Sequence, residues 1–169
     1  AGASTRSAQA ADVAMRTSLE FIDPREQWTA AYLASGKNHL KVIRLLHEPR
    51  ADLDKGTPDD GNTPTGVAAE YGHTEMVQLL YDLGADVHRA RNDGSRPIHS
   101  AARMGHDKTV LLLLSLRAAV DSQDNDACTP CRDAAFAGHA EVIRLLITHR
   151  ADIDLADRLE MTPLYAAAR

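Results

Sequence analysis

Four prolines recur at intervals of 33 residues along this chain: Pro64, Pro97, Pro130 and Pro163. Glycine-histidine pairs keep the same interval: Gly72-His73, Gly105-His106 and Gly138-His139. A helix-sized apolar stretch follows each pair. A fixed period of this length indicates a repeat array, in which each unit is stable only when it packs against its neighbours. An array within 169 residues can form a single domain.

The composition fits closely packed short helices. Hydrophobic residues make up 44% of the chain but aromatic residues only 4%, so Ala and Leu supply most of the apolar surface. A core built from β-sheet would be richer in Val, Ile and aromatic residues. Together, the period and the composition predict an all-α fold.

Charge, hydropathy and cysteine content argue against several classes of function. The net charge of -5 disfavours broad binding to nucleic acid, which requires a basic face. The longest apolar run, Val110 to Leu114, is far too short for direct insertion into a membrane. Two cysteines cannot form a disulfide framework. We therefore expect an intracellular, reducing location, the cytoplasm first, with the nucleus or an organelle left open.

Each recurring residue has a structural role. Thr-Pro, as in Thr63-Pro64, begins a helix, because Pro fits the first helical position and Thr caps the free N–H groups. The alanine pair Ala68-Ala69 lets two helices approach closely. Gly72 and its equivalents end this first helix in the left-handed conformation. A second, apolar helix and a tight turn then lead to the next unit.

These residues resemble the ankyrin repeat. The family pattern Thr-Pro-Leu-His-x-Ala-Ala, then Gly-His, Leu-Leu and Gly-Ala-Asp, can be laid over nearly all of residues 24–169. The resemblance implies an ankyrin-repeat solenoid of stacked antiparallel helix pairs. In such a solenoid, β-turn loops project at right angles to the helices and contribute to a concave binding face.

The copies depart from the family pattern at several positions. Of the histidines in the first helix only His99 is present, and other residues take its place elsewhere: Tyr32, Gly66, Arg132 and Tyr165. Arginines replace the glycine that ends the second helix: Arg50, Arg117 and Arg150. Ala119 replaces the usual Asp. A residue other than Gly held in left-handed geometry costs about 1 kcal/mol, so we predict a moderately stable array.

The period divides the chain into a cap and repeats. We predict a helical capping segment over residues 1–23, because the exposed end of an array needs a cover. The predicted repeats are 24–57, 58–90, 91–123 and 124–156, followed by a partial repeat, 157–169. A half repeat should leave Leu164 and Ala167 poorly covered. Either the natural chain continues, or a remainder is disordered, or a partner covers this end.

Two groups of residues resemble reactive or metal sites, and we interpret both as structural. Cys128 and Cys131 have the spacing of a redox dithiol, but they fall on the Thr-Pro position of a repeat and lack a thioredoxin-like context. Cys131 should point inward. Four histidines recur once per repeat: His39, His73, His106 and His139. Because they are a whole repeat apart, a shared metal site is not expected. We predict no catalytic residue, metal site or cofactor.

The resemblance also implies a possible modification. Some ankyrin proteins are hydroxylated at a position in the turn after the second helix. The residues at this position are Asp54, His88, Asp121 and Asp154. The alternative is that they are ordinary surface residues.

In the family, partner-binding residues lie in the turns and at the end of the first helix. Trp, Tyr and Arg at such positions favour binding, since these residue types are enriched in hot spots. The predicted partner-binding residues are Trp28, Lys37, Asp60, Asn62, Glu70, Tyr71, Asp93, Ser95, Arg103, Met104, Asp126, Phe136 and Met161. The acidic turns favour a partner with a basic or mixed surface. The alternative is that these residues fill contacts between repeats.

We therefore predict a non-enzymatic module or scaffold that binds a partner protein through the concave face and the turn tips. We expect no nucleic acid, no small-molecule substrate and no direct membrane insertion. Two alternatives remain. The chain could be a regulatory or targeting segment of a larger enzyme or membrane protein, or a structural subunit of a large assembly.

Overall fold

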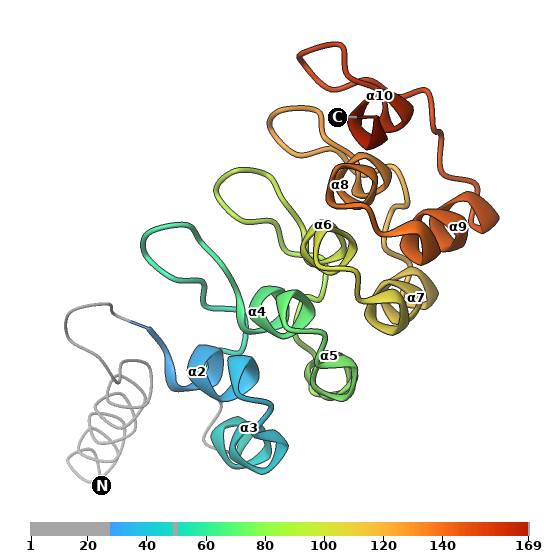
Figure 1. The fold of residues 1–169 in the computed structure, drawn as a ribbon. Coiled ribbons are helices and arrows are strands. Elements are labelled where there is room, and N and C mark those ends of the chain that lie inside the picture. The colour runs from blue at the N-terminus through green and yellow to red at the C-terminus, as the bar shows by residue number, and fades with distance from the viewer. Residues whose placement is uncertain (1–27, 49–50, 169) are drawn as a thin grey trace, which may run out of the picture.

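The computed structural model describes residues 28–48 and 51–168, and within these ranges all regular structure is helical. The first helices of the repeats are α2 (Ala30–Gly36), α4 (Pro64–Glu70), α6 (Pro97–Arg103), α8 (Pro130–Ala137) and α10 (Pro163–Ala167). The second helices are α3 (Leu40–His47), α5 (Thr74–Asp82), α7 (Asp107–Ser115) and α9 (Ala140–Thr148). The two sets form two rows, and turn loops project beside the first row (Figure 1). The predicted all-α solenoid is confirmed.

The first helices begin where the Thr-Pro pattern predicts. The Oγ1 of Thr63 accepts a hydrogen bond from the N–H of Gly66 at 3.0 Å. Equivalent caps are formed by Thr29, Thr129 and Thr162. Arg96 occupies this position in α6, and there its own N–H donates to Nδ1 of His99 at 3.2 Å. Four of the five first helices therefore share one capping device, and α6 uses another.

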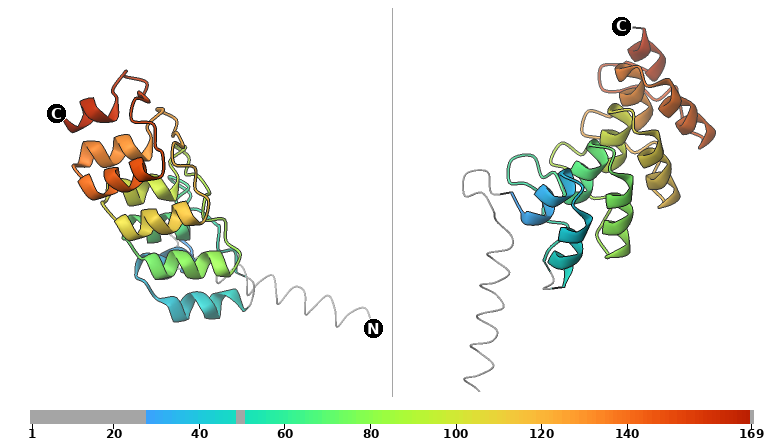
Figure 2. Two further views of the ribbon diagram at one scale, coloured as in Figure 1. Left: turned by 90° about the vertical axis from the view of Figure 1, so that its right-hand side faces the viewer. Right: turned by 60° about the horizontal axis from the view of Figure 1, so that its bottom comes forward.

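Small residues pack the helices of the first row together. Ala68, Ala69, Ala101 and Ala102 are all fully buried, so adjacent first helices lie close to each other. Most of the larger buried side chains come from the second row, among them Met76, Leu80, Leu113 and Leu146. Figure 2 shows the second helices stacked above one another along the array. Helices of five to nine residues would be unstable alone, so this packing holds them in place.

Histidine side chains join each repeat to the one before. The ring of His106 lies with Nε2 2.9 Å from the carbonyl oxygen of Glu70, at the end of α4. Since a carbonyl can only accept, Nε2 carries the proton. His73 and His139 make the same contact with the carbonyls of Gly36 and Arg103. The recurring histidines therefore have structural partners between repeats.

The left-handed residues lie where the pattern places them. The φ angles of Gly72, Gly105 and Gly138 are 69°, 76° and 79°. Asn38, which replaces glycine in the first repeat, has a φ of 56°. Arg117 and Arg150 are held at 72° and 67°, so the strain expected of arginine at this position is present. Arg50 lies outside the described residues.

The two ends of the array test different predictions. At one end, α10 leaves Leu164 79% exposed, as the half repeat predicts. At the other, the capping helix predicted over residues 1–23 lies outside the described residues, and the repeat boundaries remain predictions. Within the described ranges, every helix is too short to cross a bilayer.

Candidate functional site

The first helices and the turn tips together form one face of the array, which we call the inner face. Backbone hydrogen bonds connect the turn tips in sequence. The N–H of Asn92 donates to the carbonyl of Asp60 at 2.9 Å, and that of Asn125 donates to the carbonyl of Asp93 at 2.8 Å. Arg158 donates in the same way to Asp126 at 2.9 Å. Three exposed acidic residues thus recur at one position of neighbouring turns: Asp60, Asp93 and Asp126.

A pocket of about 200 Å³ opens on the inner face between α2 and α4. We call it the aromatic pocket, and it is lined by Trp28, Tyr32, Leu33, Gly36, Lys37, Val67 and Tyr71. The rings of Trp28 and Tyr32 lie 5.5 Å apart at 52° to each other. Tyr71 is 59% exposed and its ring stacks against His73 at 6.0 Å. The pocket can therefore hold an apolar or aromatic side chain against aromatic walls.

Gly36 gives the aromatic pocket its depth. A Cβ atom added at this position would lie 3.2 Å from Cγ2 of Val67 and 3.9 Å from the ring of Tyr71. These are two of the residues that line the pocket, so any side chain at position 36 would occupy part of its volume. Lys37 follows directly and is exposed, which places one cationic group at the rim.

The acidic turns influence the pocket electrostatically. Burial raises the pKa of the Tyr32 hydroxyl, and the negative charge of Asp60 raises the pKa further. The Tyr32 hydroxyl lies 3.5 Å from Nδ2 of Asn62, at the base of the turn that carries Asp60. The pocket is thus apolar inside, with a carboxylate nearby on one side and Lys37 on its rim.

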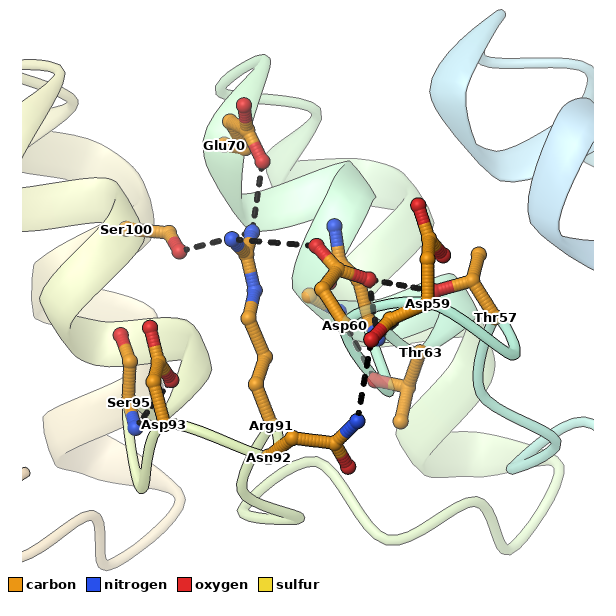
Figure 3. Close-up of polar contacts among 12 residues, drawn as sticks. Thr57, Asp59, Asp60, Thr63, Glu70, Arg91, Asn92, Asp93, Ser95 and Ser100 are labelled. Atoms are coloured by element: carbon orange, nitrogen blue, oxygen red, sulfur yellow. Dashed lines mark hydrogen bonds and ion pairs between the residues drawn. The ribbon is translucent and has the colours of Figure 1, made fainter. Parts of the chain in front are cut away.

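An ion-pair network lies farther along the inner face (Figure 3). Nη2 of Arg91 lies 2.6 Å from Oε2 of Glu70 and donates to Oγ of Ser100 at 3.2 Å. Nη1 of Arg91 lies 3.9 Å from Oδ2 of Asp60. Only 13% of the Arg91 side chain is exposed, against 34% of Glu70. The charge of Glu70 is therefore largely used within the protein.

A further aromatic residue, Phe136, lies on the inner face at α8. Phe136 is 61% exposed, and the guanidinium of Arg132 lies 5.2 Å from the centre of its ring. Nη2 of Arg132 is held by Oδ2 of Asp157 at 3.0 Å. A cation held over one face of a ring favours a fixed ring orientation. The exposed ring of Phe136 is thus held in place by a cation on one of its faces.

Sequence comparison decides the family. A profile described as ankyrin repeats matches three overlapping parts of the chain, residues 8–91, 49–124 and 98–169. This chain is an ankyrin repeat protein. The helix pairs, the histidine contacts between repeats and the projecting turns described above are those of its ankyrin repeats.

Curated relatives share the repeats and differ in their other domains. The chain is 40% identical over 65 residues to ankyrin repeat and SAM domain-containing protein 6 of Mus musculus, covering 38% of this chain and 7% of the relative. It is 34% identical over 85 residues to ankyrin repeat and SOCS box protein 6 of Homo sapiens, covering 48% and 20%. An ankyrin repeat and KH domain-containing protein of Caenorhabditis briggsae is 34% identical over 50 residues, covering 30% and 2%. The chain thus spans at most a fifth of the length of these relatives.

The ankyrin fold brings some predicted binding residues together and separates others. Trp28, Lys37 and Tyr71, far apart in sequence, line the aromatic pocket. Most of the other predicted residues are exposed along the inner face and the turns: Asp60, Asp93, Arg103, Met104, Asp126 and Phe136. Glu70 and Met161 are partly exposed. Trp28, Lys37 and Tyr71 are thus predicted residues that the fold gathers into one pocket.

The structure differs from the prediction at Asn62 and Ser95, each of which is only 2% exposed. The backbone N–H of Asn62 donates to Oγ1 of Thr57 at 3.0 Å. The N–H of Ser95 donates to Oδ1 of Asp93 at 2.8 Å. These bonds close the turns inward, so both side chains lie beneath the surface. We therefore correct the predicted binding surface by removing both residues.

The predicted set omitted four residues that line the aromatic pocket: Tyr32, Leu33, Gly36 and Val67. Tyr32 carried a signal, because it replaces the histidine of the first helix and so departs from the repeat. Gly36 also departs from its repeat position, where Glu70 and Arg103 stand in later copies. Val67 carried none, since an apolar residue inside a helix predicts core packing equally well.

Cys128 and Cys131 are both buried and free, in agreement with their structural interpretation. Burial raises the pKa of the Cys128 thiol to about 11 and also raises that of Cys131. A reactive dithiol requires the opposite shift, because the thiolate is the nucleophile. Across residues 28–48 and 51–168, no group of three or more His, Cys, Asp or Glu side chains is arranged to hold a metal ion.

Proposed function

We propose that this ankyrin repeat protein binds a partner protein through its inner face, with the aromatic pocket as the anchor site. The pocket itself is the observation that carries the proposal. It gathers three aromatic side chains around a glycine that keeps the space open. Binding energy in protein interfaces concentrates where aromatic anchors meet fitted pockets. An apolar side chain of the partner would enter the pocket.

The acidic turns indicate the charge of the partner. Asp60, Asp93 and Asp126 are exposed on neighbouring turn tips, and the backbone ladder fixes their spacing. Glu70 contributes less, because Arg91 compensates its charge. A partner segment with a bulky apolar residue followed by basic residues would match both features. Charge complementarity of this kind mainly raises the association rate and the specificity.

Peptide selection would test the proposal, because it does not require an identified partner. Random peptides displayed on phage would be selected against the immobilised chain, and the affinity of enriched peptides measured by calorimetry. We expect Tyr71→Ala to weaken binding about tenfold or more, as hot-spot aromatic residues do. Gly36→Ala should weaken it as well, because the added methyl group narrows the pocket.

Tyr81 provides a matched control. It belongs to the same repeat and is 47% exposed, but it lies on α5 in the second row and does not line the aromatic pocket. Tyr81→Ala should leave the affinity of selected peptides unchanged. Two outcomes would count against the pocket as the anchor site. In the first, Tyr71→Ala and Tyr81→Ala weaken peptide binding equally. In the second, neither Tyr71→Ala nor Gly36→Ala weakens it.

A second candidate is that the chain acts as the binding segment of a larger protein. The observation that favours it is the set of relatives, each named for ankyrin repeats together with a SAM, SOCS box or KH domain. The size of the native protein on an immunoblot decides between the two. A native mass near 18.3 kDa would contradict the second candidate.

A further inference from the structure

The largest cavity described lies away from the aromatic pocket, at the junction between the second and third repeats. It measures about 390 Å³, within the range of small-molecule sites, and we call it the junction cavity. Its apolar walls include Val87, Pro97 and Ile98, all buried. Its polar lining consists of His88, Arg96, Arg117, Ser122 and Gln123. The cavity thus combines an apolar interior with two guanidinium groups and no carboxylate.

This charge pattern is absent from the equivalent positions of the flanking junctions. At the preceding junction these positions hold Asp54, Asp86 and Arg89 as their charged residues, and at the following one they hold Asp121, Asp152 and Arg150. At the junction cavity, His88 and Ala119 stand where both neighbours have aspartates. Arg96 stands where both have threonine. Three departures from the repeat therefore remove negative charge from this cavity or add positive charge to it.

The flanking junctions also show what the cavity lacks. In the preceding one, Oδ1 of Asp54 accepts a hydrogen bond from the N–H of Asp86 at 2.8 Å. In the following one, Oδ1 of Asp121 accepts from the N–H of Asp152 at 3.0 Å. Among the described residues His88 makes no such bond to the N–H of Ala119; its Nε2 instead lies 2.9 Å from the carbonyl oxygen of Leu116 and donates to it. Among the described residues, the N–H of Ala119 has no hydrogen-bond acceptor.

Two further groups are available to a ligand. Nη1 of Arg96 donates to the carbonyl of His88 at 2.9 Å, which positions a guanidinium that has further N–H groups to offer. Arg117 is exposed, and within the described part of the chain its side chain has no bonded partner. The buried Oγ of Ser122 likewise makes no hydrogen bond to the described residues. A buried hydroxyl without a partner lowers stability unless a bound species satisfies it.

We propose that the junction cavity binds a small organic anion. Its carboxylate or phosphate group would take the place of the missing aspartate, accepting hydrogen bonds from the Ala119 N–H and from the guanidinium groups of Arg96 and Arg117. Its apolar body would lie against Val87, Pro97 and Ile98. Guanidinium groups favour both of these head groups, which they bind through paired N–H donors. From the repeat pattern we expected no small-molecule substrate; this site is indicated by the cavity, its charge pattern and its unpaired donors.

Ligand binding can be measured directly by titrating ¹⁵N-labelled protein and following the amide signals of Ala118 to Gln123. Benzoate and phenyl phosphate supply the two head groups on an apolar body, benzyl alcohol lacks the charge, and inorganic phosphate lacks the body. We expect saturable shifts with one or both aromatic anions, and weaker or no shifts with benzyl alcohol and phosphate. Absence of saturable shifts with both aromatic anions would overturn the proposal.

Variants that restore the repeat pattern separate binding from folding. Arg117→Gly removes one guanidinium and supplies the residue that its φ of 72° favours. Arg150→Gly makes the same change at the equivalent position of the next repeat, where φ is 67°, and it lies outside the cavity. Both should fold at least as well as the natural chain. Only Arg117→Gly should lower the affinity for the aromatic anion, by about tenfold or more, as expected when a hydrogen bond to a charged group is lost.

Ala119→Asp provides a second, independent variant. It returns the carboxylate that both flanking junctions carry at this position, and we expect it to abolish binding of the aromatic anions by occupying and repelling their site. Equal weakening by Arg117→Gly and Arg150→Gly would show general charge attraction and overturn the proposal. If acidic peptides bind at this site and the small anions do not, the ligand is a protein segment and the proposal is also overturned.

Discussion

Nε2 of His139 lies 3.0 Å from the carbonyl oxygen of Arg103, and a Cβ on Gly105 would lie 2.6 Å from Nδ1 of the same ring. The histidine therefore occupies the space that the glycine of the preceding repeat leaves open. This pairing recurs between Gly72 and His106. The glycine therefore meets two needs at the contact between repeats: it adopts the left-handed turn, and it leaves room for the histidine ring of the next repeat.

Gly105→Ala should destabilise the array more than Gly138→Ala. Both residues have φ near 80°, so each alanine costs about 1 kcal/mol in left-handed geometry. Only at Gly105 would the methyl group also meet a histidine ring, since a Cβ on Gly138 meets nothing within 4 Å. Displacing the hydrogen bond of that ring costs about 1 kcal/mol more. Urea denaturation of both variants measures the difference, and equal losses would contradict this account of the contact between repeats.

Glu70→Gln should lower the free energy of unfolding by about 1–2 kcal/mol, because it leaves the mostly buried Arg91 guanidinium without its closest anion. Glu141→Gln is the matched control. Its partner Arg144 is 72% exposed, so the loss should be at most a few tenths of a kcal/mol. Chemical denaturation at low salt gives both values. A loss from Glu141→Gln as large as that from Glu70→Gln would contradict the difference in burial.

Asp133→Asn should flatten the pH dependence of stability in the weakly acidic range. Burial raises the pKa of Asp133 from 3.8 to about 6, although Arg103 and Arg132 oppose the shift. The folded state therefore binds this proton more tightly than the unfolded chain, and its contribution to stability is lost as pH rises from 3.8 to about 6. The asparagine variant lacks this contribution. Thermal unfolding across that range would show it, and parallel profiles for both proteins would contradict the raised pKa.

Both cysteines should resist modification in the folded protein. A chromogenic disulfide reagent at neutral pH should react with Cys128 and Cys131 far more slowly than with free cysteine, because both thiols are buried and their pKa values are raised. In urea, two thiols per chain should react rapidly. One fast-reacting thiol in the native protein would instead indicate an accessible, activated cysteine.

The sequence predicted the scaffold well because its signals are local. Thr63-Pro64 begins a helix because the Thr63 hydroxyl caps a free N–H of the first turn. Gly105 forms a left-handed turn because glycine adopts a positive φ without strain. Repetition then places each copy in register with the next. Even the strained Arg117 and Arg150 could be recognised, because the second repeat has Gly84 at the same position, with a φ of 87°.

The site was less predictable because it depends on contacts between distant residues. Arg91 and Glu70 are 21 positions apart and belong to different repeats, and neither residue alone indicates the pair. Asn62 and Ser95 read as surface residues in a turn, yet the inward hydrogen bonds of their N–H groups bury them. Tyr32 and Tyr71 become part of one pocket only when α2 and α4 are packed together.

The ladder of backbone bonds between turn tips has a consequence for how a ligand is aligned. Because Asp60, Asp93 and Asp126 recur with the same backbone contact to the next turn, one stretch of basic residues would fit equally well after a shift by one repeat. The aromatic pocket occurs at only one end of that row, between α2 and α4. Insertion of one side chain there would select a single alignment, so that the pocket would fix the register in which the partner binds along the repeating acidic surface.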